Sequence, residues 1–305
     1  TNDIDSYLKK YRLHKAVEMM KNFRNTHKIE ADDVMTLALQ FECLGDHIVK
    51  LDTENNHSIS LNDKETSAFL DALNDFYRQS DFRKFFDQHS DVYANGILSF
   101  YNSVVSHIDP SWYSRFYGTQ PNKDLHIVIG FASGGNYYRA TRTRQGGPEE
   151  IFSIMYYAVD NNGRPLYDKS AVGTITEELC LSFIDIENND VKTTLEKACE
   201  NAHRYTREKP IAAVTDKSIM EESLAYASAI YYLIDNGSSK KSIRKAVDEG
   251  IERGFSWTPE LIKRIYYYTE NRKEFPTFAS FYPEIIEFFK DYTANLGKTI
   301  LKVLR

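Results

Sequence analysis

The residues of this sequence whose types could do chemistry are three glutamates in two apolar segments. Glu177 and Glu178 stand side by side in TITEELCLSF, residues 174–183, and Glu222 lies in MEESLAYASAIYYL, residues 220–233. Carboxylates can act as general bases, share a proton with a second carboxylate, or bind hard cations. Two adjacent glutamates on a helix are also typical of a solvated face, so this pattern alone leaves all of these roles open.

The first segment has the register of a zinc-peptidase helix. In the pattern His-Glu-x-x-His, two imidazoles reach one metal ion from the same helical face, and the glutamate activates the metal-bound water. Glu178 holds the position of that glutamate, the general base, while Glu177 and Leu181 hold the positions of the two histidines. The segment therefore keeps the base and lacks both imidazole ligands.

Several segments in the same order resemble a family of exported proteins from Bacteroidetes-type bacteria, domain of unknown function 4932. The similar segments are FLDALNDFYRQSDFRKFFDQHSDVY (69–93), FYGTQPNKDLHIVIGFASGGNYY (116–138), MEESLAYASAIYYL (220–233) and YTENRKEFPTFASFYPEIIEFF (268–289). Members of this family carry a gluzincin-like His-Glu-x-x-His helix followed by Ser-Phe. The resemblance covers most of the chain and implies a gluzincin-like metallopeptidase architecture.

The resemblance also implies a third metal ligand, a glutamate on a later helix. The matching residue is Glu222, which lies 44 positions after the general-base glutamate (222 minus 178). The metal positions of the family thus fall on Glu177, Leu181 and Glu222, as vestigial positions. Tyr226 stands where relatives usually carry arginine, and Glu221 stands where they usually carry asparagine.

These departures remove the zinc chemistry that the resemblance would otherwise imply. Leu181 has no lone pair to offer, and the carboxylate of Glu177 differs from imidazole in reach and angle. Without zinc, nothing lowers the pKa of a bound water from about 16 to about 7, so Glu178 would have no activated nucleophile. We expect no zinc, no other cofactor, and no peptide hydrolysis by this mechanism.

Two alternatives keep a chemical role for the site. The carboxylates could bind calcium or magnesium, which accept oxygen ligands and waters. Glu178 and Glu222 could instead share a proton as an acid pair, with Glu178 as the general base of an active hydrolase. Cys180, three residues from Glu177, could act as a soft ligand, but it fits better as a core residue of an apolar helix.

Tyr226, Tyr205 and His203 are the candidate ligand-binding residues. His203 and Tyr205, in ENAHRYT, could lie near a cleft as proton donors or could form a surface pair. Tyr266 to Tyr268 could form an aromatic platform for sugars or the buried edge of a helix. A peptide or glycan is therefore the expected class of ligand.

The composition excludes several classes of protein. The net charge of −6 argues against a nucleic-acid partner, so Arg139, Arg142 and Arg144 are expected on a charged strand face. The longest apolar run, Leu224 to Ile234, is far shorter than the ~20 residues that span a bilayer, so no transmembrane segment is expected. The three cysteines match no zinc knuckle and no redox pair, which favours buried free thiols.

The hydrophobic periodicity predicts an α+β fold that is mostly helical with a small antiparallel sheet. Residues 1–118 read as a helical N-terminal lobe, in which DVMTLALQFECL is a helical segment. Residues 119–305 begin with three strands, expected to form an antiparallel meander, and continue as a helical metallopeptidase-like lobe. The two lobes are expected to pack together.

We therefore expect a catalytically inactive relative of zinc metallopeptidases, retained to bind a peptide or glycan along the edge of the sheet. The alternative is an active hydrolase with a carboxylate-bound cation or an acid pair. The resemblance implies export to the periplasm, or a lipid-anchored place in the cell envelope; no signal segment is present in this sequence.

Overall fold

The structure is a computed structural model of the chain, and the chain divides into two compact units. One unit comprises Thr1–His107 with Lys123–Ala171, and the other comprises Ile108–Asn122 with Val172–Arg305. The residues described are 2–29, 31–53, 61–131, 137–156, 159, 167, 169–184, 186, 189–206 and 219–303. Each unit is considered by itself below.

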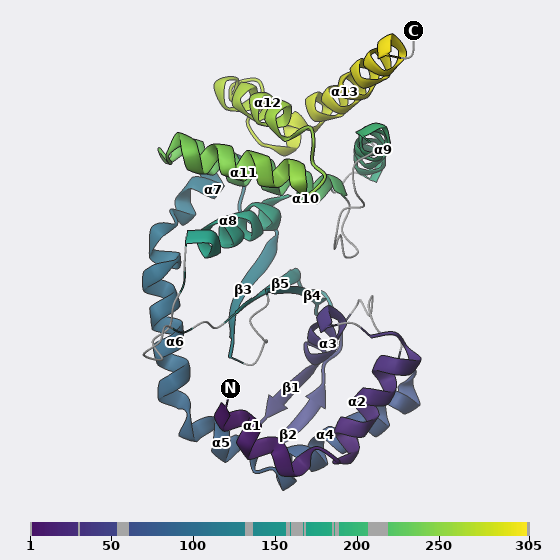
Figure 1. Ribbon diagram of the computed structural model, residues 1–305, viewed down its shortest axis with the longest axis vertical. Coiled ribbons are helices and arrows are strands. Elements are labelled where there is room, and N and C mark those ends of the chain that lie inside the picture. The colour runs from purple at the N-terminus through teal and green to yellow at the C-terminus, as the bar shows by residue number, and fades with distance from the viewer. Residues whose placement is uncertain are drawn as a thin grey trace. The chain divides into compact units, whose positions relative to one another are not determined.

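The first unit contains short helices, a hairpin and a three-stranded sheet (Figure 1). Its elements are α1 (Asn2–Leu8), η1 (Lys9–Tyr11), α2 (Lys15–Thr26), α3 (Ala31–Ala38), β1 (Phe41–Leu44), β2 (His47–Lys50), α4 (Asp63–Gln79), α5 (Phe82–Gln88), α6 (Ser90–Ser103), η2 (Val105–His107), β3 (Lys123–Gly130), β4 (Tyr138–Thr143) and β5 (Glu149–Tyr156). Phe23, Ile29, Leu37 and Phe69 form one of its apolar cores. These residues come from α2, α3, α4 and the turn after α2, so burial of one face of each helix holds this part together.

The hairpin β1–β2 corrects the prediction that DVMTLALQFECL is wholly helical. Helix α3 ends at Ala38, and the last four residues of that segment form β1, paired antiparallel with β2. Gly45 opens the two-residue turn with φ +65°, a backbone conformation that short hairpin turns require and glycine adopts without strain. The glycine turn after this segment favours a hairpin, although the spacing of its apolar residues fits a helix.

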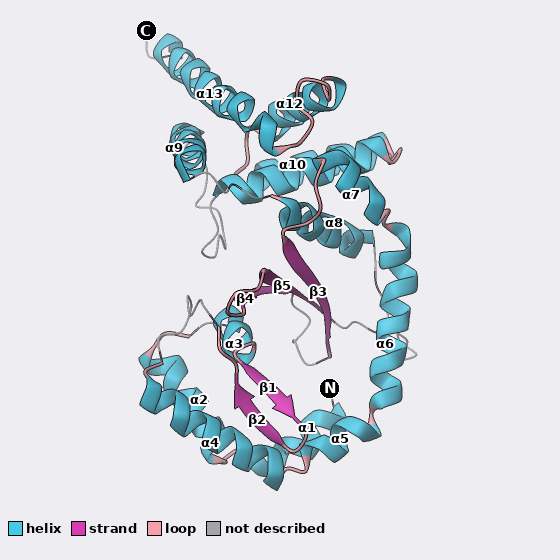
Figure 2. Cartoon of the chain, turned by 180° about the vertical axis from the view of Figure 1, so that it is seen from behind, coloured by secondary structure: helices cyan, strands magenta, loops and turns pink. Residues whose placement is uncertain are grey.

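The three predicted strands are present, but the predicted antiparallel meander is wrong. The strand order is β3-β5-β4, with β3 parallel to β5 and β4 antiparallel to β5 (Figure 2). β5 is buried along most of its length, whereas β3 alternates between exposed and partly buried positions. A strand with an unbroken run of buried residues takes the central place of a sheet, because both of its faces are covered. This sheet is therefore mixed, and the purely antiparallel sheet among the described residues is the β1–β2 hairpin.

The second unit is helical in the part of it that the structure describes. Its elements are α7 (Pro110–Tyr117), α8 (Lys169–Phe183, which begins just before the unit boundary), α9 (Asn189–Thr206), α10 (Ile219–Asp235), α11 (Lys240–Glu252), α12 (Thr258–Glu270), η3 (Ala279–Phe281) and α13 (Tyr282–Val303). α10 is buried on nearly all sides, as expected of a helix that is apolar around its circumference. α11 and α12 both pack against α10.

Helix α7 joins the second unit although the chain on both sides of it belongs to the first. Trp112 donates its indole N–H to Asp235 of α10 at 2.7 Å, and its ring stacks on Phe116 at 4.5 Å. The Tyr268 hydroxyl of α12 donates to the Phe116 carbonyl at 2.6 Å. These contacts fix α7 to α10 and α12.

The fold class is α+β and mostly helical, as the sequence predicts. The division into units differs from the predicted boundary at residue 118, because the strands after that residue belong with the N-terminal helices and α7 belongs with the C-terminal ones. Arg142 of β4, for example, donates to the Leu39 carbonyl at 3.0 Å. No helix among the described residues is both long and apolar enough to cross a bilayer.

Candidate functional site

The adjacent glutamates of α8 are buried inside the second unit. Glu177 is 9% exposed, Glu178 is 1% exposed, and Leu181 is fully buried one turn further along the helix. Glu222 on α10 is also buried. A solvated helical face is therefore not the explanation for this pair. Buried carboxylates require hydrogen-bonding or charged partners.

The partner of Glu177 is Arg253, which follows the last residue of α11. Two backbone bonds end the helix, from Gly254 N–H to Ile251 C=O and from Phe255 N–H to Gly250 C=O, each 2.9 Å long. This is the Schellman arrangement, and Gly254 takes the left-handed position with φ +97°. The glycine therefore turns the chain immediately after Arg253.

The Arg253 guanidinium makes a two-pronged hydrogen bond with Glu177. Its Nη1 donates to Oε2 at 3.0 Å, and its Nη2 donates to Oε1 at 2.7 Å. The same Nη2 lies 3.9 Å from Oε2 of Glu222. One cation thus joins carboxylates from α8 and α10, and the fork of arginine matches a carboxylate in both charge and geometry.

Tyr226 of α10 lies under the guanidinium. The Arg253 Cζ is 4.3 Å from the centre of the Tyr226 ring, and the Tyr226 hydroxyl donates to the Ala246 carbonyl of α11 at 2.8 Å. A Cβ at Gly250 would come within 2.6 Å of the ring, so a glycine is required there. The ring provides a cation–π contact and anchors α10 to α11. These two helices are in contact along the chain's second unit (Figure 1).

Burial and charge act in opposite directions on this pair. Burial raises the pKa of Glu177, Arg253 counteracts it, and the nearby carboxylates Glu222 and Glu178 raise it further. Burial disfavours the charge on Arg253, but the Glu177 carboxylate outweighs burial and raises the pKa of the guanidinium. Arg253 therefore stays protonated, and its side chain is 39% exposed.

The residues at the metal positions do not fit a zinc ion. Leu181 supplies no donor atom, and both oxygens of Glu177 accept hydrogen bonds from Arg253. Within the described ranges, no three side chains of histidine, cysteine, aspartate or glutamate come together as a metal-binding group. Cys180 is fully buried, and burial raises the pKa of its thiol, which disfavours the thiolate that binds metals.

The remaining candidate residues take different places. His203 and Tyr205 belong to α9, but their side chains lie outside the described residues. Glu221 forms an ion pair of 3.6 Å with Lys192 of α9. Of the three consecutive tyrosines of α12, Tyr268 is fully buried and the other two are exposed, so the run lies at the edge of the buried core. The aromatic platform for sugars stays a prediction.

The arginines of the second strand lie in the first unit and pair mainly with one carboxylate. Arg142 donates to Glu150 of β5 through Nε at 2.7 Å and Nη2 at 2.9 Å. Arg144 lies 3.4 Å from the same carboxylate. The expected charged strand face is thus partly an internal ion-pair network.

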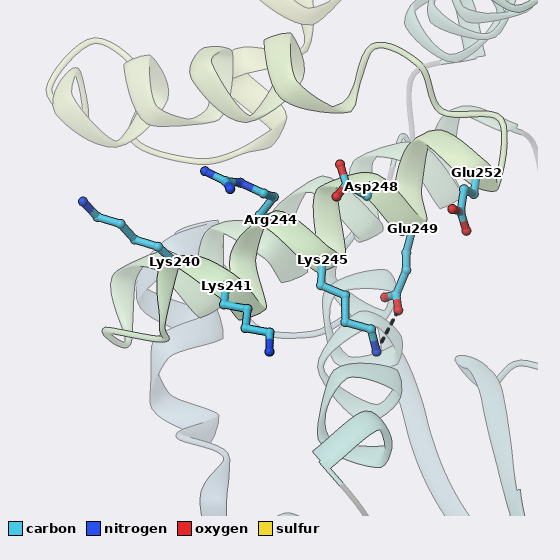
Figure 3. A pocket seen from close by; sticks show the side chains of 7 residues that line it. All are labelled: Lys240, Lys241, Arg244, Lys245, Asp248, Glu249 and Glu252. Atoms are coloured by element: carbon cyan, nitrogen blue, oxygen red, sulfur yellow. Dashed lines mark ion pairs between the residues drawn. The ribbon is translucent and has the colours of Figure 1, made fainter.

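A shallow cavity of about 540 Å³ lies on the outer face of α11. Its lining residues all come from that helix: Lys240, Lys241, Arg244, Lys245, Asp248, Glu249 and Glu252 (Figure 3). The basic side chains are at the N-terminal end and the acidic ones at the C-terminal end, with one ion pair of 3.2 Å between Lys245 and Glu249. The cavity contains none of the buried carboxylates, so it is separate from the site around Arg253.

Sequence reasoning found the carboxylates and Tyr226 but missed Arg253. The signals present in the sequence were the glycine after it, which marks the end of a helix, and the need of a buried glutamate for a cation. Neither signal identifies which arginine reaches Glu177, because the two residues are 76 positions apart.

Comparison with known proteins gives one family. The family model described as "Domain of unknown function (DUF4932)" matches residues 1–288. No curated protein and no solved structure matches the chain.

Proposed function

The chain belongs to the DUF4932 family, and from this premise we propose that it is a non-catalytic protein that binds an extended peptide. In this proposal it is an exported relative of gluzincin-type zinc peptidases, placed in the cell envelope, that has lost the metal and with it hydrolysis. Loss of two imidazole ligands removes the group that would activate water at neutral pH.

The observation that carries the proposal is the double hydrogen bond from Arg253 to Glu177. Glu177 holds the position of a ligand in the zinc-peptidase register. A divalent metal ion bound to the same carboxylate would lie within a few ångströms of the Arg253 guanidinium. The electrostatic repulsion between the two cations is large in a partly buried site. The chain therefore supplies its own cation to the carboxylate, which supports the proposal that no metal ion binds there.

For the ligand, the support comes from the outer strand β3 of the mixed sheet. Among the described residues, β3 has a strand neighbour on one side only, because the order is β3-β5-β4. His126 and Val128 are exposed and alternate with less exposed positions along β3. An extended peptide could add to this edge through main-chain hydrogen bonds, with side-chain specificity at every second residue.

The first test is metal content and turnover. Purified protein is dialysed against zinc, analysed by mass spectrometry for metals, and incubated with a random peptide library. We expect no stoichiometric zinc and no cleavage. The positive control is the triple variant Glu177→His, Leu181→His and Arg253→Ala, which restores two imidazoles and removes the cation. If the wild-type chain holds about one zinc, the proposal is wrong.

Hydrolysis by the wild-type chain would favour the other function, an active hydrolase. In that case Glu178→Gln should abolish cleavage, since this change removes the general base.

The second test concerns the peptide. Binding of the same library is measured for the wild-type chain and for Val128→Asp, which introduces a charge on β3. The matched control is Val92→Asp on α6, also at an exposed position of the first unit. We expect weaker binding for Val128→Asp alone. Equal loss in both variants, or no binding by the wild-type chain, would contradict the edge-strand assignment.

A further inference from the structure

Three helices of the second unit present small polar groups to one part of its interior. Tyr113 and Tyr117 lie four apart on α7, and Thr176 and Cys180 lie four apart on α8. A spacing of four places each pair on one face of its helix. Ser228 of α10 completes the set, and all five residues are at most 1% exposed.

Aromatic contacts fix how these helical faces meet. The ring of Phe183, one turn beyond Cys180, stacks on Tyr113 at 6.1 Å and on Tyr117 at 5.0 Å. Tyr232, one turn beyond Ser228, stacks on Tyr113 at 5.4 Å. The two tyrosine rings are therefore held between α8 and α10.

The hydroxyl groups at the ends of these rings are close to further polar side chains. Burial raises the pKa of Tyr113, while the nearby Thr176 hydroxyl lowers it. Burial likewise raises the pKa of Tyr117, which lies beside Cys180 and Ser228. Tyr113 thus lies beside a hydroxyl of α8, and Tyr117 lies beside polar side chains of α8 and α10. The polar groups therefore share one region of the core.

Four oxygens of this group lack a hydrogen-bond partner at proper distance and angle among the described residues. They are Tyr113 Oη, Tyr117 Oη, Thr176 Oγ1 and Ser228 Oγ. A buried hydroxyl without a partner destabilises the folded state, and buried polar groups in proteins are nearly always satisfied by protein or by ordered water. Four such groups at one place call for a common partner.

We propose that the four hydroxyls form an internal site that binds ordered water between α7, α8 and α10. A buried water makes about three hydrogen bonds, and each hydroxyl can both donate and accept, so this group can satisfy one or two waters. The bound water links α7 to the helix that carries Glu177, without using the carboxylates of the candidate site. The site thus helps to hold α8 in position against α7 and α10.

The first experiment uses the sign of a stability change. Tyr117→Phe and Thr176→Val each remove one hydroxyl and keep the shape of the side chain. If water bridges the group, each variant should lower Tm by about 2–4 °C. If the hydroxyls are dry and unpaired, removal of one should raise Tm. Tyr266→Phe on the exposed face of α12 is the control and should leave Tm unchanged.

Direct hydrogen bonds between the hydroxyls would also lower Tm, so a second measurement is needed. Oxygen-17 magnetic relaxation dispersion of the full chain counts waters that exchange slowly with solvent. We expect the count to fall by one or two in the double variant Thr176→Val and Ser228→Ala, or in Tyr117→Phe if the double variant does not fold. An unchanged count, or a rise in Tm, overturns the proposal.

Discussion

Arg253, at the end of α11, donates two hydrogen bonds to Glu177 on α8, across 76 positions of the sequence. Arg253→Ala leaves a buried carboxylate without its cation. We expect the free energy of unfolding to fall by about 2 kcal/mol, less than for a fully buried pair because the arginine is partly exposed. Chemical denaturation at neutral pH measures this change.

The control for this prediction is an exposed ion pair on the same helix. Lys245→Ala removes the contact with Glu249, which is one of the surface pairs that contribute little. We expect a change below about 0.5 kcal/mol. Equal effects of the two alanine variants would mean that the buried pair does not stabilise the fold.

Among the described residues, two partly buried arginine–glutamate pairs have carboxyl pKa values that move in opposite directions. Burial raises the pKa of Glu177, and its single arginine does not offset burial together with the carboxylates of Glu222 and Glu178. A hydrogen bond from Arg142 lowers the pKa of Glu150, and the nearby charge of Arg144 lowers it further. The balance of nearby charges, rather than the arginine alone, sets the direction.

These directions predict opposite pH dependence. A carboxyl whose folded pKa is raised binds more protons in the folded state, so its contribution to stability falls as the pH rises from 4.5 through the folded pKa of Glu177. A lowered pKa has the reverse effect, so the contribution of Glu150 is present above pH 4.5 and is lost as the pH falls through its folded pKa.

The measurement compares Glu177→Gln and Glu150→Gln with the wild-type chain at several pH values from about 3 to 7. We expect the destabilisation by Glu177→Gln to shrink as the pH rises and that by Glu150→Gln to grow. If the destabilisation by the two variants changed with pH in the same direction, the raised pKa of Glu177 would be contradicted.

Gly250 and Gly173 give a matched pair of glycine substitutions in helices. At Gly250 a Cβ would meet the Tyr226 ring at 2.6 Å, whereas at Gly173 nothing lies within 4 Å. Gly250→Ala should therefore destabilise by about 1–3 kcal/mol through overpacking. Gly173→Ala should stabilise by up to about 1 kcal/mol through helix propensity. Thermal unfolding checks both signs, and stabilisation by Gly250→Ala would remove the argument for close packing of α10 on α11.

The charges of α11 run against its macrodipole, with lysines in the first turn and acidic residues in the last turns. Lys240→Glu together with Lys241→Glu reverses the unfavourable end and gives opposite charges to Arg244 and Lys245 one turn on. We expect a gain of about 1 kcal/mol in the free energy of unfolding. The gain should decrease at high salt; a salt-independent change would point to another cause.

Local sequence signals predicted the three strands of the mixed sheet and most helices, while strand order needed tertiary information. The alternation in residues 123–130 and the apolar run in 151–155 identify β3 and the core of β5. Neighbouring strands were assumed to pair, yet β5 lies between β3 and β4 because it is the most buried of the three. The β1–β2 hairpin was missed because an apolar segment of this length fits a helix or a strand.

For the site, the motif register identified Glu177 and Glu178, and the family resemblance identified Glu222. The structure brings Glu177 and Glu222 to one guanidinium. Arg253 could not be predicted, since an arginine near the end of a helix ordinarily interacts with the last carbonyls of that helix. Its long-range role depends on how α11 packs, which no local pattern encodes. The metal, peptide and export predictions stay predictions.

The position of α7 has a consequence for synthesis of the protein. α7 leaves the ribosome well before its partner α10, whose first residue is made 102 residues later (219 minus 117). At usual translation rates this interval is roughly 5 to 20 seconds. During that time Trp112 and Phe116 have no α10 or α12 to cover them. A chain truncated near residue 118 yields neither unit whole, because the first unit also needs residues 123–171 and the second also needs the helices from α8 to α13.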